Sequence, residues 1–145
     1  MAVIEQCELV RVVIPEHWDT YHRIRREVLF ESRGRHGVYD RDHPDEFAQQ
    51  NHPLMLIAAE RPIGTARLDC DPNGRGTDRL VAVAGKDQRR GHGRTMMSLL
   101  ELYAVKQGCI VLEVNSAPDA VEFYQRLGWT LVDAARESPL LSKTL

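Results

Sequence analysis

A segment rich in glycine and arginine, placed just before an amphipathic stretch, carries the clearest chemical signal in the sequence. Gln88-Arg89-Arg90-Gly91-His92-Gly93 follows a β-branched segment and precedes apolar residues at helical spacing. The first turn of a helix leaves about four backbone N–H groups without intrahelical partners, at the positive end of the helix dipole. Glycines let the backbone approach a phosphate closely, and the neighbouring arginines add positive charge. The segment predicts a site for a small anion such as a pyrophosphate, although an ordinary tight loop has the same composition.

Two common nucleotide-binding motifs are excluded for this segment. No Gly-Lys-Ser/Thr follows the glycines, so the loop is not a Walker A motif. Met96 occupies the position where a third glycine of the dinucleotide-binding fingerprint would fall. An anion site at this segment would therefore belong to another class of phosphate-binding loop.

The charge distribution favours a small anionic ligand over a polyanion. The 145 residues carry a net charge of −2, with 7 basic and 11 acidic residues in 1–60 and 12 basic and 10 acidic residues in 61–145. Nucleic-acid binding needs a basic surface, which this balance does not supply. No apolar run approaches the roughly 18 residues of a membrane helix, and the N-terminus does not resemble a signal peptide. We therefore expect a cytoplasmic protein of one domain, residues 1–145, that binds neither nucleic acid nor membrane.

Cysteine and histidine usage gives no metal or redox prediction. Cys7, Cys70 and Cys109 are odd in number and far apart in sequence, which favours reduced thiols, and Cys70 and Cys109 are expected to be inert packing residues. His36, His43 and His52 lie in a polar stretch without the spacing of a zinc site, so no metal is expected.

The remaining pattern predicts the elements that must position the anion site. Expected strands are 7–14, 54–60, 63–68, 78–83, 109–114, 129–132 and 140–143, and expected helices are 15–32, 45–49, 91–107 and 116–127. Arg61-Pro62 would join a hairpin, Ser116 would cap the last helix, and Arg25 would lie among the polar residues of the first. Alternation of strands and helices after residue 78 predicts parallel pairing, and the hairpin is antiparallel. We therefore expect an α/β protein with a mixed sheet and flanking helices.

The segment from Asp78 to Val132 resembles the GCN5-related N-acetyltransferases, the GNAT superfamily. Their acetyl-CoA loop has the form Gln/Arg-x-x-Gly-x-Gly/Ala, which Gln88 to Gly93 fits. A second family block, Asn…Ala…Phe-Tyr-x-x-Leu-Gly-Phe, is similar to Asn115 to Trp129. Arg26 to Glu31 and Pro62 to Leu68 resemble the first helix and third strand of many members less closely. The resemblance implies the GNAT fold: a mixed, mostly antiparallel sheet with one splayed parallel strand pair.

The resemblance also implies a reaction and the residues that serve it. Acetyl-CoA would be the co-substrate, and a primary amine would attack its thioester directly in a ternary complex. Tyr124 matches the general acid that protonates the departing thiolate, and a phenol with a pKa near 10 can do so. The implied cofactor-binding residues are Val81, Ala82 and Val83 on the splayed strand, Gln88, Arg89, Arg90, Gly91, His92, Gly93, Arg94 and Thr95 in the pyrophosphate loop, and Asn115.

Two features depart from the family pattern. Six residues, Ala84 to Arg89, separate Val83 from Arg90-Gly91, so the loop is longer than in many members. His92 stands where a small or aliphatic residue is more usual, and we expect its side chain to face solvent.

The general base and the acceptor stay open. Candidates for the base are Glu113, Asp69, Asp78, Glu31 and His36. The leading acceptor is a small amine, and Asp40, Asp42, Asp45 and Glu46 could attract a cationic one. The alternatives are transfer to a protein N-terminus or lysine, and a non-catalytic acyl-CoA-binding module, against which Tyr124 argues. The acceptor would be selected within the chain or across an oligomer interface, such as that of a homodimer.

Overall fold

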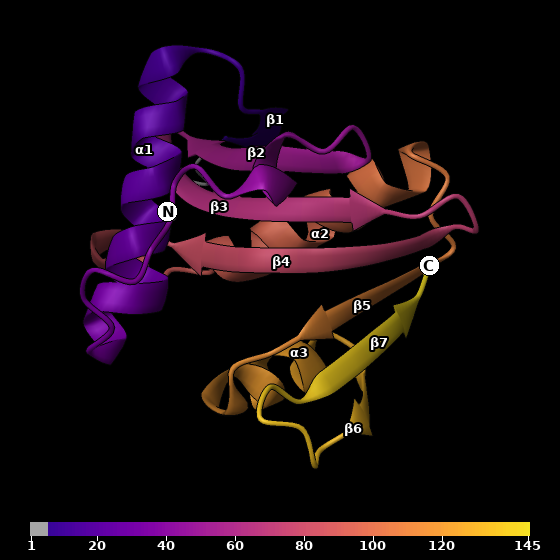
Figure 1. The fold of residues 1–145 in the computed structure, drawn as a ribbon. Coiled ribbons are helices and arrows are strands. Elements are labelled where there is room, and N and C mark those ends of the chain that lie inside the picture. The colour runs from indigo at the N-terminus through magenta and orange to yellow at the C-terminus, as the bar shows by residue number, and fades with distance from the viewer. Residues whose placement is uncertain (1–5) are drawn as a thin grey trace, which may run out of the picture.

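The computed structural model describes residues 6–145. These residues fold around one seven-stranded mixed sheet (Figure 1). The strands are β1 Cys7–Arg11, β2 Asn51–Ala58, β3 Arg61–Cys70, β4 Arg75–Val83, β5 Val111–Asn115, β6 Thr130–Asp133 and β7 Leu140–Thr144, and the α-helices are α1 Pro15–Arg25, α2 His92–Lys106 and α3 Val121–Arg126. The strand order is β1-β2-β3-β4-β5-β7-β6. The parallel contact joins β4 to β5, and the other described pairs are antiparallel. The predicted fold class is confirmed.

The hairpin of β2 and β3 turns two residues earlier than expected. Ala59 and Glu60 form the turn and both have positive φ, 48° and 69°, which suits the twist of a tight hairpin. Arg61 and Pro62 therefore belong to β3 rather than to the connection. β1 ends at Arg11, three residues short of the predicted limit, because the chain then turns into α1.

The strands β4 and β5 pair over only part of their length. Residues Arg75 to Asp78 pair with Val111 to Val114, and beyond Asp78 no β5 residue opposes β4. Figure 1 shows the two strands diverging toward the end of the sheet where α1 lies. The divergence opens a wedge between two strands that are otherwise neighbours.

The second parallel pair expected from the strand–helix alternation does not form. β7 inserts between β5 and β6 and is antiparallel to both. Its Leu141 is fully buried, so the last apolar segment of the chain gains more burial inside the sheet than at an edge.

The first helical stretch changes geometry along its length. α1 continues into a π-helical turn at Arg26–Phe30 and a 3₁₀ turn at Glu31–Arg33. Tyr21 and Ile24 are fully buried against the sheet, as the spacing predicted. The placement of Arg25 on the polar face was wrong, since its side chain is only 2% exposed.

Helices α2 and α3 cover the opposite face from α1. Met97, Leu100 and Ala104 of α2 pack with Leu112 and Tyr124 in the main core. Ser116 does not cap the last helix, because its hydroxyl donates to the carbonyl of Ala117 and a 3₁₀ turn at Pro118–Ala120 precedes α3. Within residues 6–145 no helix is both long and apolar enough to cross a bilayer.

Candidate functional site

A bulge in β4 lies at the point where this strand leaves β5. Arg79 pairs with Arg67, and Ala82 pairs with Thr65, so Leu80 and Val81 together oppose only Ala66. Leu80 has a φ of +52°, which a leucine adopts only at a cost in strain. Leu80 and Val81 thus have no one-to-one partner on β3 and none on β5, and the Leu80 carbonyl accepts from the Thr65 hydroxyl over 3.5 Å.

The wedge between β4 and β5 is a cavity of about 510 Å³, which we call the β4–β5 cavity. Leu80 and Val81 line one side, and Val114 and Asn115 line the other. Tyr124 lines it from α3, and Leu29 and Phe30 line it from the π-helical turn. The bulge therefore forms part of the wall of this cavity.

Tyr124 is 5% exposed and holds its ring edge-on to Trp129, with centroids 5.4 Å apart. Burial and the nearby Asp78 carboxyl raise its pKa. The hydroxyl is therefore protonated at neutral pH. Burial and Asp78 are the influences on the pKa of this hydroxyl within residues 6–145, with no side-chain hydrogen bond among them, and the residue lines the cavity, so a ligand there can bond to it.

The glycine segment before α2 forms the tight turn and helix start that the sequence predicted. Gly91 is the N-cap of α2 with a φ of +84°, and the first intrahelical bond runs from the Thr95 N–H to the Gly91 carbonyl over 3.1 Å. A Cβ on Gly93 would meet the ring of Phe123 at 3.3 Å, so this glycine lets α2 and α3 approach closely. Arg89, Arg90 and Arg94 are exposed around this helix terminus.

The longer connection before the glycines folds into a 3₁₀ turn, Gly85–Asp87. Asp87 is buried and pairs with Arg61 at 3.3 Å. The Gln88 amide donates to the Val83 carbonyl over 2.9 Å, which ties the loop back to β4. A second groove, lined by Gly85, Gln88 and Arg33 among others, adjoins the β4–β5 cavity at Arg33. The extra residues thus form part of a groove that meets the β4–β5 cavity at Arg33.

The other predicted cofactor residues differ in where they lie. Val81 and Asn115 line the β4–β5 cavity. Ala82 packs against Ile24, and Val83 packs on the α2 side, so neither side chain enters the cavity. The expectation that the His92 side chain faces solvent was wrong: the residue is 8% exposed, because it is the first residue of α2 and is turned inward.

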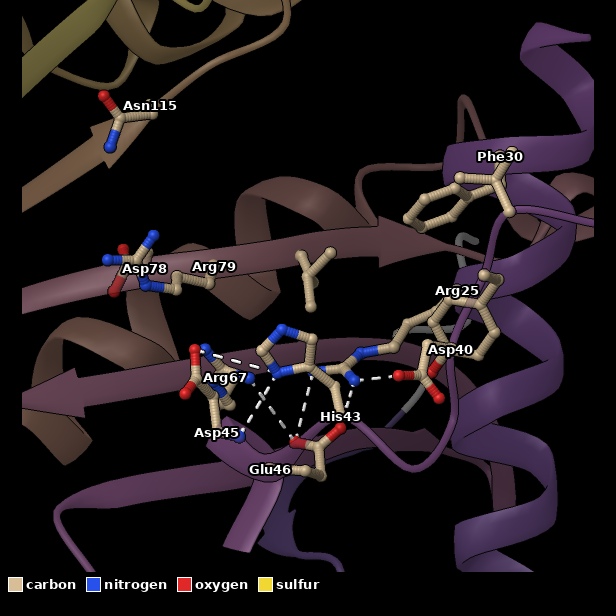
Figure 2. A pocket seen from close by; sticks show the side chains of 13 residues that line it. Arg25, Phe30, Asp40, His43, Asp45, Glu46, Arg67, Asp78, Arg79 and Asn115 are labelled. Atoms are coloured by element: carbon tan, nitrogen blue, oxygen red, sulfur yellow. Dashed lines mark hydrogen bonds and ion pairs between the residues drawn. The ribbon is translucent and has the colours of Figure 1, made fainter. Parts of the chain in front are cut away.

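A second cavity, of about 440 Å³, lies on the α1 side of the sheet, and we call it the α1-side cavity (Figure 2). Its walls come from α1, from β3 and β4 and from the segment 38–46. Phe30, Asp78, Leu80 and Asn115 line both cavities. In Figure 2, Phe30 and Asn115 lie on opposite sides of the opening. These four residues define a seam at which the two cavities meet.

Asp78 is the one proposed general base found at this seam. It is 2% exposed, and neither carboxyl oxygen has a hydrogen-bond partner in the described chain. Burial, with smaller contributions from Glu101 and Asp69, raises its pKa well above the usual range for an aspartate. A buried acid without partners beside two cavities is a candidate for proton transfer.

The other proposed bases are held elsewhere. Glu113 pairs with Arg75, Glu31 pairs with Arg26, and His36 is exposed outside both cavities. Asp69 receives a bidentate pair of hydrogen bonds from Arg67, at 2.7 and 2.9 Å, so its lone pairs are largely committed.

The floor of the α1-side cavity is a buried ionic network that sequence reasoning missed. Arg25 pairs with Glu46, and Tyr21 donates to Glu46 over 3.0 Å. Burial raises the pKa of Tyr21, so this hydroxyl stays protonated. Glu46 thus neutralises a buried guanidinium and is not a surface group that attracts a cationic acceptor. Of the four acids proposed for that role, Asp40 and Asp45 lie at the rim and Asp42 lies outside the cavity.

The signal for this network was present in the sequence as arginines inside apolar patterns. Arg25 falls on the stripe of Tyr21 and Ile24, and Arg67 interrupts the apolar run of β3. An arginine at such a position must be paired when it is buried. No pattern in the sequence predicts the bulge at Leu80, because the bulge depends on the register between β4 and β3.

Cysteine and histidine chemistry plays no part at the seam. The Cys70 and Cys109 sulfurs lie 3.7 Å apart as free thiols, and burial raises the pKa of both, to about 12 for Cys70. Residues 6–145 contain no cluster of three or more histidine, cysteine or acidic groups suited to a metal ion.

Comparison with known proteins places this geometry among acyltransferases. A family model described as the acetyltransferase (GNAT) family matches residues 17–129. An acyl-CoA N-acyltransferase from Pseudomonas aeruginosa is 14% identical, with a TM-score of 0.80 over 97% of this chain and 100% of that chain. An acetyltransferase from Streptococcus agalactiae is 12% identical, with a TM-score of 0.76 over 96% and 98%. A PaiA N-acetyltransferase from Thermoplasma acidophilum, solved with coenzyme A, is 15% identical, with a TM-score of 0.75 over 97% and 99%.

Proposed function

The chain belongs to the acetyltransferase (GNAT) family, and from that premise we propose that it transfers an acetyl group from acetyl-CoA to the nitrogen of a small primary amine. The 145 residues would act as one catalytic domain. The amine would attack the thioester directly while both substrates are bound.

One observation carries this proposal: two cavities meet at a seam that contains a buried acid. The β4–β5 cavity and its adjoining groove lead from the loop at the start of α2 to Tyr124. The α1-side cavity meets the β4–β5 cavity at the same seam. Two separately walled spaces that share Asp78 and Leu80 suit two substrates held together, for which positioning supplies much of the rate.

The residues of the seam match the needs of the reaction. As the amine nitrogen forms its bond to the carbonyl carbon, a backbone N–H group at the bulge would stabilise the developing oxyanion. Asp78 in its deprotonated form would accept the proton lost by the amine. The raised pKa of Asp78 leaves only a fraction of this form available, so turnover should rise with pH. The C–S bond then breaks, and Tyr124 would donate its proton to the departing thiolate. Asp78 loses its proton to solvent and Tyr124 regains one before the next turnover.

The walls of the α1-side cavity favour a small acceptor over a protein. Val38, Tyr39, Asp40, His43, Asp45 and Glu46 all come from the segment between α1 and β2. This segment covers one side of the cavity and leaves less room for a protein chain than for a small molecule.

The test is release of free coenzyme A from acetyl-CoA in the presence of a panel of amines, with the melting temperature measured in parallel. We expect acetyl-CoA to raise the melting temperature through linkage, and thiol to appear only when an amine is added. Stabilisation without turnover on any amine would favour the binding-module alternative. No stabilisation at millimolar acetyl-CoA would remove the cofactor assignment.

A further inference from the structure

The charges beneath the α1-side cavity do not balance. Five ionised side chains are in contact there: Arg25 with Glu46, Arg67 with Asp69 and with Glu46, and Arg79 with Asp69. Three guanidiniums therefore face two carboxylates. His22 does not add to the charge, because burial, together with Arg41 and Arg25, lowers its pKa to about 4. Within these contacts the guanidiniums outnumber the carboxylates by one, and the exposed acids of the cavity, Asp40 and Asp45, lie apart from them at the rim.

The excess positive charge resides on Arg79. Arg25 and Arg67 are 2% and 6% exposed and are engaged by Glu46 and Asp69. The Arg79 side chain is 46% exposed, and its Nε donates to Asp69 over 2.7 Å. Its two terminal nitrogens have no protein partner within residues 6–145, and the residue lines the cavity. Asp69 thus orients a guanidinium whose remaining donors point to open space.

The position of Arg79 and the acidic residues at the rim of the cavity further restrict the class of ligand. Arg79 stands between Asp78 and Leu80, the two residues of β4 that line both cavities. Arg79 and Leu80 line the same cavity, so an anion on Arg79 would share that cavity with the bulge at which the amine must attack. At the rim, Asp40 and Asp45 are exposed acids, and the Asp45 carboxylate lies 3.7 Å from His43. A positively charged wall below a rim of acidic residues complements a zwitterion, which carries one negative and one positive group.

We propose, on the basis of the acyl transfer proposed above, that the acceptor is an amino acid whose carboxylate binds Arg79 while its amine lies at the seam. The guanidinium fork matches a carboxylate in shape, and a single unbalanced charge matches a monoanion better than a phosphate dianion.

The test compares each amino acid with its decarboxylated amine, using pairs such as lysine with cadaverine and phenylalanine with phenethylamine. We measure kcat/KM for wild type, Arg79→Gln, Arg79→Lys and the matched control Arg75→Gln, which alters an exposed arginine of β4 outside both cavities. We expect wild type to prefer the amino acid by roughly ten- to a hundredfold. Arg79→Gln should remove most of this preference, mainly through KM, and Arg79→Lys should keep part of it. Arg75→Gln should leave it unchanged.

The outcomes separate the two proposals. Turnover of amines without preference for the carboxylate, or an equal loss on both members of a pair in Arg79→Gln, overturns the amino-acid assignment and leaves acyl transfer standing. Absence of turnover on every amine overturns both. The stabilisation by acetyl-CoA should be the same in all four proteins, which shows that the variants are folded and bind the cofactor.

Discussion

Asp78 and Tyr124 face one cavity, and burial raises the pKa of each. A raised pKa makes the Asp78 carboxylate a stronger base than a solvated aspartate. It also keeps the Tyr124 phenol protonated until a thiolate is formed beside it, and the same burial makes that thiolate more basic. The proposed division into a base and an acid thus follows from the chemistry of each group in one environment.

Removing the Tyr124 hydroxyl should affect turnover alone. Tyr124→Phe keeps the buried ring and its contact with Trp129, and it removes only the hydroxyl. We expect kcat to fall by about a hundredfold or more, with the Kd for coenzyme A unchanged by calorimetry. Tyr103→Phe, whose hydroxyl contacts His52 away from both cavities, is the control. Unchanged kinetics in Tyr124→Phe would remove this residue as the acid.

We expect the Asp78 carboxyl to lower the free energy of unfolding at high pH. Its pKa in the folded state lies above that of the unfolded chain, so the folded state retains a proton that the unfolded state releases as the pH rises. Asp78→Asn should therefore unfold at a higher temperature than wild type at pH 8, with the difference shrinking as the pH falls toward 4. His22 is present in both proteins, so its contribution to the pH dependence of stability cancels in the comparison. The exposed control Asp119→Asn should show no such trend, and a constant offset for Asp78→Asn would contradict the shifted pKa.

Among the elements, those defined by local pattern were predicted well from sequence. α2 was expected over 91–107 and spans His92–Lys106, because its apolar spacing and the flanking glycines are local signals. The splay of β4 from β5, the bulge at Leu80 and the insertion of β7 depend on contacts between distant segments. Tyr124 and Asn115 could be named as site residues through the resemblance alone, whereas Asp78 was singled out from the other acids only by its burial at the seam.

The loop before α2 provides a test at the scale of the element. Gly91→Val places a β-branched residue at a φ of +84°, which should distort the first turn of α2 and weaken coenzyme A binding by about tenfold. Gly85→Ala is the matched control in the same loop, because a Cβ there meets no atom within 4 Å and its φ is not in the left-handed region. Equal affinities for the two variants by calorimetry would show that the glycine turn does not support the cofactor.

For the molecule as a whole, the near-neutral net charge averages over two regions of local positive charge. Arg89, Arg90 and Arg94 surround the helix terminus at one end, and a network with one unbalanced arginine underlies the α1-side cavity. The sequence indicated the first region but placed Arg25 and Glu46 on the surface. Their burial changes the expected acceptor from a cation to a zwitterion.

The central claim is that the two cavities hold both substrates at the same time. Initial rates measured while acetyl-CoA and the acceptor are both varied test this most directly. The account predicts double-reciprocal lines that intersect, as for a ternary complex. Parallel lines, together with labelled acetyl found on the protein after mixing with acetyl-CoA alone, would contradict it.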